Sequence, residues 1–144
     1  MTRVDFYILQ ARGREARLRF ACRLVEKALR HGNTVFIAVD NEEEAKNLDQ
    51  LLWEFQPESF IPHNIDTEVS AQAVPPIILG FGPECGDHHD MLINLRSDIP
   101  AFFSRFQRLT EVVTQDEEVL DRTRTNWKYY RDRGYPLQRH AISA

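Results

Sequence analysis

The side chains of this sequence that are best suited to hold a ligand lie near its C-terminal end. Arg124, Lys128 and Arg131 recur at i, i+4 and i+7, which places them along one edge of a helix. Trp127 follows Arg124 by three residues and precedes Arg131 by four, so its indole neighbours two guanidinium groups. A guanidinium forms paired hydrogen bonds with a carboxylate, and an indole supplies apolar surface beside it. The pattern favours a site for a peptide carboxylate, and the same spacing also suits a solvated basic edge beside a core Trp.

A second candidate site lies in residues 48–64, LDQLLWEFQPESFIPHN. The helix that leads into it carries an apolar stripe at helical spacing, formed by Ala45, Leu48, Leu51, Leu52 and Phe55. Trp53 falls about 140° from the middle of that stripe, so the core does not need it. Pro57 ends the helix because its ring fixes φ and it has no N–H to donate, and an apolar loop with Phe60 follows. Two interpretations remain open: a shallow surface pocket, or a Trp that a neighbouring segment covers.

The residue patterns of nucleotide-dependent and hydrolytic enzymes are missing from the sequence. The turn after the first predicted strand reads QARGR at residues 10–14, which matches neither GxGxxG nor GxxxxGK[ST]. Without closely spaced glycines the backbone cannot wrap a pyrophosphate at the start of a helix. No Ser lies in a nucleophile elbow, and no pair of carboxylates is placed for acid–base work. We therefore predict a non-catalytic chain without a cofactor.

Metal chemistry has one candidate cluster, in a glycine-rich loop over residues 80–90. It contains four residue types that bind metals, Cys85, His88, His89 and Asp90. A structural zinc site usually needs a second pair of ligands at a matching distance, and only the isolated His31 and His63 remain. We interpret the cluster as a polar loop. Cys22 lies on the apolar face of a predicted helix, and we expect it in the core.

The composition is that of one soluble globular domain of 144 residues, with 42% hydrophobic and 28% charged residues. No run of about 18 apolar residues could span a membrane, and the apolar patch near the N-terminus is too short for a signal peptide. Two cysteines make no disulfide framework and suit a reducing compartment. We expect a cytoplasmic protein.

The charge is unevenly distributed along the chain, whose net charge is −4. Residues 1–30 carry a net charge of +5, residues 31–90 one of −11, residues 91–118 one of −2 and residues 119–144 one of +4. The overall acidity argues against bulk electrostatic binding of nucleic acid. A basic C-terminal segment on an acidic protein instead suits the capture of a small acidic partner.

Hydrophobic periodicity predicts alternating strands and helices. We expect strands at 4–9, 34–39, 74–79, 91–95 and 109–114, and helices at 14–30, 41–55, 100–106 and 115–133. Strands that alternate with helices favour a parallel sheet with right-handed crossovers. Residues 34–39, TVFIAV, form a continuous apolar run of the kind found in strands that are covered on both faces.

Several segments of the chain match one protein family. LDQLLWEFQPESFIPHN, FYIL, MLINLR, FFSRFQRLTEVV and NWKYYRDRGY resemble the corresponding segments of the chi subunit of bacterial DNA polymerase III holoenzyme. The resemblance covers nearly the whole chain, apart from about residues 66–89. It implies an α/β fold over residues 1–144, a single-domain Rossmann-like three-layer fold with a mostly parallel central sheet and no nucleotide-binding loop.

The resemblance also implies a function. Members of the family are non-catalytic accessory subunits of the clamp-loader complex that pair one-to-one with the psi subunit, which tethers them to the clamp loader. They bind the C-terminal tail of single-stranded-DNA-binding protein, a short acidic peptide that ends in Pro-Phe. Such a protein contacts DNA indirectly and has no contact with a membrane.

The tail-contacting positions of the family match Trp53, Phe60, Arg124 and Trp127 in this sequence, with Trp127 in place of a tyrosine. A usually basic family position is Leu120 here.

These matches predict how the tail binds. Its terminal Phe ring enters an apolar pocket near Trp53, Phe60 and Trp127, and its α-carboxylate pairs with Arg124. Lys128 and Arg131 pair with the aspartates that precede the Phe.

For psi the sequence supports one hypothesis. Phe102, Phe103 and Phe106 supply more aromatic area than one short helix can bury, so we expect them to form the psi-binding surface.

Two rival functions remain at this point. A direct single-stranded nucleic-acid-binding module would use Trp127, Tyr129 and Tyr130 as a stacking platform, and a small nucleotide-dependent enzyme would use the same fold.

Overall fold

A parallel sheet with helices on both faces forms the frame of the protein. The computed structural model describes residues 1–54, 63–65 and 74–142. The strands in these residues are β1 (Arg3–Leu9), β2 (Val35–Ala38), β3 (His63–Ile65), β4 (Ile77–Gly80), β5 (Met91–Asn94), β6 (Arg108–Val113) and β7 (Leu137–Ile142). The helices are α1 (Arg14–Arg30), α2 (Glu42–Glu54) and α3 (Glu117–Asp132), and a short 3-10 helix spans Phe103–Arg105.

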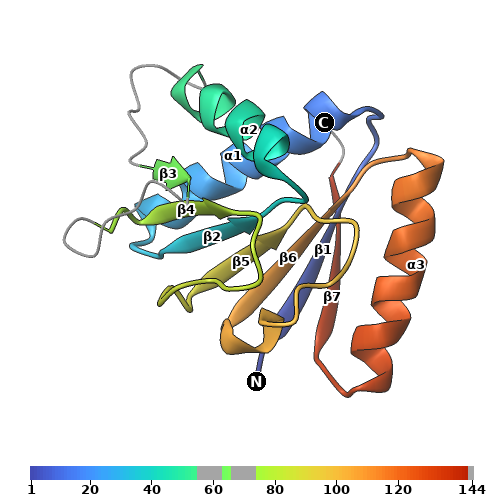
Figure 1. Cartoon of the computed structure of the whole chain (residues 1–144). Coiled ribbons are helices and arrows are strands. Elements are labelled where there is room, and N and C mark those ends of the chain that lie inside the picture. Colours follow the sequence, from blue (N-terminus) through green and yellow to red (C-terminus); the bar gives the residue numbers. More distant parts are fainter. Residues whose placement is uncertain (55–62, 66–73, 143–144) are drawn as a thin grey trace.

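The strand order is β3-β4-β2-β5-β6-β1-β7, and every pairing is parallel. The chain moves in one direction along the sheet from β1 through α1 to β2, and in the other from β6 through α3 to β7. Right-handed crossovers in opposite directions put their helices on opposite faces. Figure 1 shows this arrangement, with α1 and α2 on one side of the sheet and α3 on the other. The predicted three-layer Rossmann-like fold is confirmed.

The two outermost strands, β3 and β7, were not predicted. Among the residues that the structure describes, each pairs with one neighbouring strand, because it lies at an end of the sheet. In β7 the side chains are exposed or half-buried, so Leu137–Ile142 lacks the apolar run that identifies a central strand. β3 is only three residues long, too short for a period to be recognised.

A hydrophobic core lies on each face of the sheet. α1 and α2 cover the first, where Cys22 is fully buried as predicted. α3 and the segment around the 3-10 helix cover the second. β2 and β5 supply side chains to both cores, and all their residues are buried.

The aromatic segment at 102–106 belongs to this second core. Phe102, Phe103 and Phe106 are only 8%, 5% and 2% exposed. Phe102 meets the ring of Phe36 edge-on at 5.5 Å, and Phe103 meets Tyr130 at 5.5 Å. The prediction that these three rings form an exposed psi-binding surface is therefore wrong, because the sheet and α3 together bury more aromatic area than the short helix could alone.

Gly80, at the end of β4, allows this core to close. A Cβ atom on Gly80 would overlap the ring of Phe36, which is fully buried. We expect Gly80→Ala to lower the free energy of unfolding by about 1–3 kcal/mol, the usual cost of overpacking a core. Urea unfolding measures this loss.

Gly82→Ala is the matched control. A Cβ atom at Gly82 meets nothing within 4 Å, so we expect a change of at most about 0.5 kcal/mol. Equal stabilities of the two variants would show that the ring of Phe36 moves aside at little cost.

Candidate functional site

The basic helix predicted near the C-terminus is α3, and one face of it packs against the sheet. Asp116 precedes its first turn, which contains Glu117 and Glu118, where the helix dipole favours negative charge. Tyr130 is fully buried and Trp127 is half-buried. The Trp127 ring lies 5.0 Å from that of Phe6 on β1, at an interplanar angle of 55°. This contact holds the indole against the sheet and leaves part of it accessible.

A cavity of about 620 Å³ opens between α3 and strands β1, β6 and β7. Its apolar lining comes from five side chains, Phe6, Ile8, Val113, Leu120 and Trp127. Its basic lining comes from four, Arg124, Lys128, Arg131 and Arg139. The four site residues that we predicted on α3 therefore share one cavity. Arg139 was missed because it lies on β7, a strand without a sequence signal.

The basic side chains of this cavity form only exposed ion pairs or none within the described residues. Arg124 Nη1 lies 2.7 Å from Asp121 Oδ1, and these side chains are 72% and 68% exposed. Arg131 pairs with its neighbour Asp132 at 3.3 Å, also at the surface. Exposed pairs of this kind contribute little to stability, so a carboxylate ligand can replace either aspartate at low cost. Within the described residues, Lys128 has no acidic partner.

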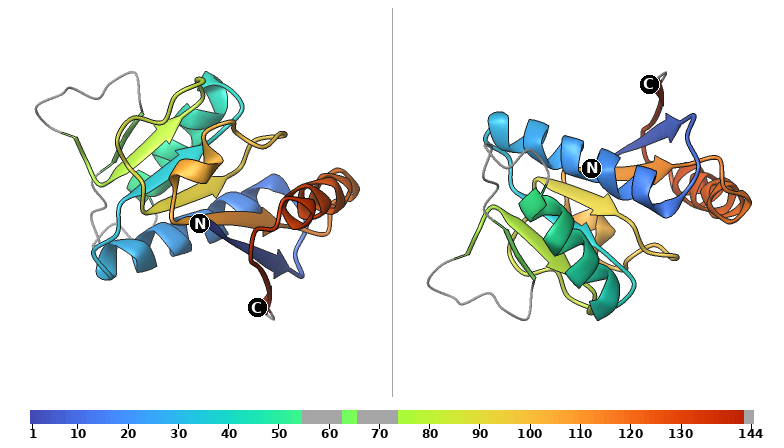
Figure 2. Two further views of the ribbon diagram at one scale, coloured as in Figure 1. Left: turned by 90° about the horizontal axis from the view of Figure 1, so that it is seen from below. Right: turned by 90° about the horizontal axis from the view of Figure 1, so that it is seen from above.

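Trp53 lies elsewhere. It projects from α2 away from the buried stripe, as predicted, and is 49% exposed. However, α2 packs on the face of the sheet opposite to α3, and both views in Figure 2 show the two helices apart. The prediction that Trp53 and Trp127 border one pocket is therefore wrong, because the sheet separates them. Phe60, the third aromatic residue of that prediction, lies outside the described residues.

The stacking platform that a direct nucleic-acid binder would build on α3 is also incomplete. Tyr130 is 0% exposed, and its ring packs against Phe6 and Phe103. The guanidinium carbon of Arg133 covers the ring of Tyr129 at 3.6 Å. Only Trp127 of the three proposed rings borders the cavity.

A buried carboxylate anchors α3 from behind. Glu111 of β6 is 6% exposed, and its Oε2 accepts hydrogen bonds from Tyr130 Oη at 2.8 Å, Asn126 Nδ2 at 3.3 Å and Asn94 Nδ2 at 3.2 Å. Burial raises the pKa of Glu111 above its usual value, and the hydrogen bond from Tyr130 opposes that rise. The sequence signal for this group was a single Glu in the apolar strand RLTEVV, which we did not interpret. The network connects the site helix to two central strands.

The C-terminal edge of the sheet is where doubly wound folds bind nucleotide phosphates, against the start of a helix. Here a side chain of the protein, that of Asp116, lies at the residue before the first helix α1. Asp116 Oδ2 accepts hydrogen bonds from Gly13 N at 2.9 Å, just before α1, and from Thr114 Oγ1 at 2.7 Å. These hydrogen bonds, that of Thr114 first, lower the pKa of Asp116 and keep it ionised. A carboxylate of the protein thus accepts the hydrogen bond of the backbone N–H that immediately precedes α1.

The loop over residues 80–90 uses its polar side chains to attach itself to neighbouring segments. Asp90 Oδ2 accepts hydrogen bonds from Thr34 N at 2.8 Å and Thr34 Oγ1 at 2.9 Å. His88 Nε2 lies 2.9 Å from the carbonyl oxygen of Pro75. In residues 1–54, 63–65 and 74–142, no three His, Cys, Asp or Glu side chains are placed to share a metal ion. None of the helices described there is long and apolar enough to cross a membrane.

Comparison with known proteins relates nearly the whole chain to one family. A family model described as DNA polymerase III chi subunit, HolC, matches residues 1–138. A Pseudomonas aeruginosa protein named DNA polymerase III subunit chi is 42% identical over 142 residues, which cover 99% of this chain and 98% of that protein. Proteins of the same name from Haemophilus influenzae and Escherichia coli are 31% and 29% identical, over 92% and 95% of this chain and 92% and 96% of their own lengths.

Proposed function

We propose a function that starts from one fact: the chain belongs to the DNA polymerase III chi subunit family. In this proposal it is a non-catalytic accessory subunit of the clamp-loader complex. Its α3 cavity binds the acidic C-terminal tail of single-stranded-DNA-binding protein, and the chain pairs with one psi subunit. It thereby links the replicase to protein-coated single-stranded DNA.

The observation that carries the tail-binding proposal is the division of the α3 cavity into an apolar part and a basic part. A tail that ends in Pro-Phe and carries aspartates needs a hydrophobic space for one ring and cations for several carboxylates. The cavity offers both within about 620 Å³. Its apolar lining includes the Phe6 and Trp127 rings, which already pack against each other. Binding of the tail therefore does not have to order these side chains, which reduces the entropic cost of binding.

The residues of the cavity suggest how the tail lies in it. The terminal Phe ring packs against Trp127 and Leu120, and its α-carboxylate forms paired hydrogen bonds with Arg124. The preceding aspartates face Lys128 and Arg131. Leu120, at a position that is usually basic in the family, adds apolar area to the site.

Arg139 supplies a cation from β7 on the opposite wall of the cavity. We infer that it compensates for the family cation that Leu120 replaces. The number of positive charges that face the tail would then equal that in family members with a basic residue at the position of Leu120.

For psi the proposal extends only to the pairing. The proposal does not use the rings at 102–106 as the docking surface, because the core buries them.

A peptide titration tests the tail site. A synthetic tail peptide is added to the protein while tryptophan fluorescence is recorded, and a control peptide lacks the final Phe. The protein has two tryptophans, so the titration is repeated with Trp53→Phe. In this variant all tryptophan fluorescence comes from Trp127. We expect saturable binding of the full peptide to both proteins and none of the control peptide.

Two outcomes would contradict the proposal. Absence of binding would show that this chain lacks the tail site. A signal that disappears in Trp53→Phe but persists in Trp127→Phe would put the tail on α2, on the other face of the sheet.

A further inference from the structure

A second basic groove runs along α1, on the face of the sheet opposite to the α3 cavity. Two adjoining hollows of about 320 and 310 Å³ form it, and they share Tyr7, Leu24 and Lys27. One wall is the C-terminal half of α1, and the other consists of β1 and its neighbouring strands. None of the sequence patterns interpreted above accounts for this groove.

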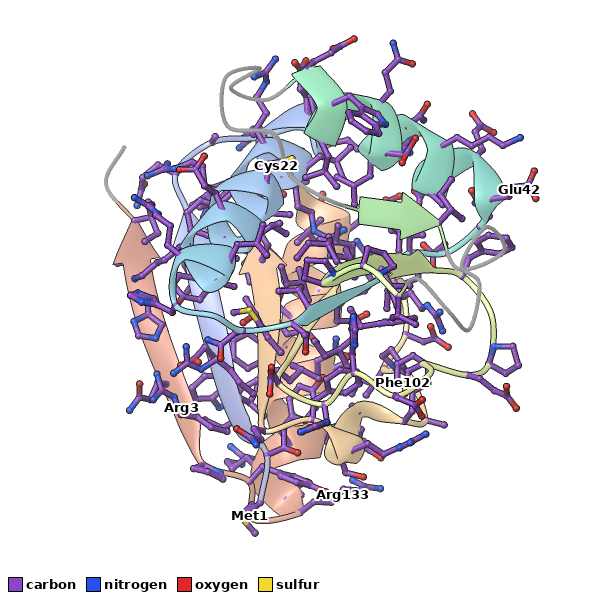
Figure 3. All side chains as sticks on the ribbon, turned by 90° about the vertical axis from the view of Figure 1, so that its left-hand side faces the viewer. Met1, Arg3, Cys22, Glu42, Phe102 and Arg133 are labelled. Carbon is purple, nitrogen blue, oxygen red and sulfur yellow. The ribbon has the colours of Figure 1, made fainter. Side chains whose placement is uncertain are left out.

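Two arginines at one end of the groove are held in place by a buried acid. Arg3 of β1 and Arg108 of β6 are register partners on adjacent strands, and Figure 3 shows Arg3 on the side of the molecule that carries α1. Their Nε atoms lie 3.3 and 3.5 Å from the oxygens of Asp5, which is fully buried. Each Nε faces Asp5, and within the described residues the terminal amino groups of both guanidiniums have no hydrogen-bond partner. The two side chains are about 40% exposed, so these amino groups are available to an anion.

The wall formed by α1 adds three cations. Arg23, Lys27 and Arg30 recur at i, i+4 and i+7 and line the groove. In the part of the chain that the structure describes, Lys27 has no acidic partner, and the exposed side chain of Arg30 pairs only with the half-buried Glu26, at 3.5 Å. The acids that line the groove are Glu26 and Asp90, and Asp90 already accepts two hydrogen bonds from Thr34.

Three aromatic side chains, Tyr7, Phe20 and His140, pack against one another beside these cations. The ring of Tyr7 is stacked on that of His140, with centroids 4.6 Å apart and planes 18° apart. The Tyr7 ring also lies 5.5 Å from that of Phe20, and the guanidinium of Arg23 lies 5.5 Å above the Phe20 ring. Because Phe20 is only 8% exposed and the Tyr7 ring is already stacked on His140, these rings shape the groove and are not free to stack with bases. The cations are the groups that can follow the backbone of a single-stranded nucleic acid.

We propose that this groove binds single-stranded DNA through its backbone phosphates. The cations are spread along the groove, one or more to each turn of α1 at about 5.4 Å per turn, rather than directed at one point. That spacing fits a chain of phosphates better than a single small anion. The groove and the α3 cavity lie on opposite faces, so the protein can hold DNA and the tail at the same time.

The test uses two charge-matched double variants of the full chain. Arg23→Gln with Lys27→Gln removes two charges from the groove, and Arg124→Gln with Lys128→Gln removes two from the α3 cavity. A labelled thymidine oligonucleotide of about 12 nucleotides is titrated with each protein at several salt concentrations, and binding is followed by fluorescence anisotropy. Tail-peptide binding is measured on the same preparations.

We expect the groove variant to bind the oligonucleotide at least about tenfold more weakly at about 50 mM salt. Its salt dependence should also be flatter by about 1.4 in the log–log slope, as for two lost phosphate contacts. Its tail binding should equal that of the wild-type protein. The α3 variant should show the reverse pattern, with unchanged DNA binding and weakened tail binding.

Three outcomes would overturn the proposal: no binding of the oligonucleotide by the wild-type protein, equal losses in both variants, or a loss only in the α3 variant. A fourth would be equal binding of an oligonucleotide with an uncharged methylphosphonate backbone, since phosphate contacts would then contribute nothing. Loss of tail binding alone, by contrast, bears on the proposed function and leaves the groove untouched.

Discussion

Replacing Arg124 by Ala is expected to weaken binding of the tail peptide by about tenfold or more. The guanidinium would donate paired hydrogen bonds to the terminal carboxylate, and hydrogen bonds to charged groups contribute about 1.5–3 kcal/mol. A tenfold change in affinity corresponds to about 1.4 kcal/mol. The fold should tolerate the change, because Ala favours helix and Arg124 is 72% exposed. Peptide titration by tryptophan fluorescence measures the effect.

Two further variants control this result. Arg105→Ala removes the same charge from an exposed position beyond the lining of the α3 cavity, and should leave the affinity unchanged. Asp121→Asn removes the carboxylate that lies 2.7 Å from Arg124 and should leave the affinity equal or tighten it, because the guanidinium loses a competing partner. An unchanged affinity in Arg124→Ala would show that the α-carboxylate of the tail does not pair with this residue. Higher salt should weaken binding in the wild-type protein, since the pairs are exposed.

Replacing Glu111 by Gln is expected to change how stability depends on pH. Burial raises the pKa of Glu111 in the folded protein, so the folded protein holds this proton more tightly than the unfolded chain does. Stability is therefore lost as the pH rises from the unfolded pKa of about 4.3 towards the raised folded value, by up to about 1.4 kcal/mol per pH unit. Gln cannot ionise and still offers an oxygen to Tyr130. The stability of Glu111→Gln relative to the wild-type protein should therefore increase through this range and then level off.

Urea unfolding at a series of pH values measures this difference, and Asp90→Asn provides a control of opposite sign. The backbone hydrogen bond from Thr34, followed by that from its hydroxyl, lowers the pKa of Asp90. Its contribution is present above the unfolded pKa of about 3.9 and is lost as the pH falls. Asp90→Asn should thus be at its greatest disadvantage near neutral pH. Parallel curves for Glu111→Gln and the wild-type protein would show that Glu111 titrates alike in both states.

The sheet separates the two binding surfaces that we propose for this small domain. α1 and α3 lie on opposite faces, and each presents a basic edge beside aromatic residues, Tyr7 on one side and Trp127 on the other. Each surface draws residues from the strands next to it. The charge distribution has the same origin, because the two positively charged segments, residues 1–30 and 119–144, contain these two helices.

The sequence by itself determined the features that depend on local spacing. α1 and α3 follow from the 3.6-residue period, and the buried strands follow from continuous apolar runs. The grouping of Arg124, Trp127, Lys128 and Arg131 was also predicted, because side chains three and four positions apart in one helix are neighbours in any fold. The off-stripe position of Trp53 was predicted for the same reason.

Only the tertiary structure decided which distant residues meet. The direction of each crossover puts α2 and α3 on opposite faces, and this separates Trp53 from Trp127. Strand order brings Arg139 of β7 to the α3 cavity. It also brings His140 to within 3.0 Å of Asp5, although 135 residues separate them in the sequence. Such contacts depend on the order and register of the strands, which the full set of packing interactions determines and no short segment encodes.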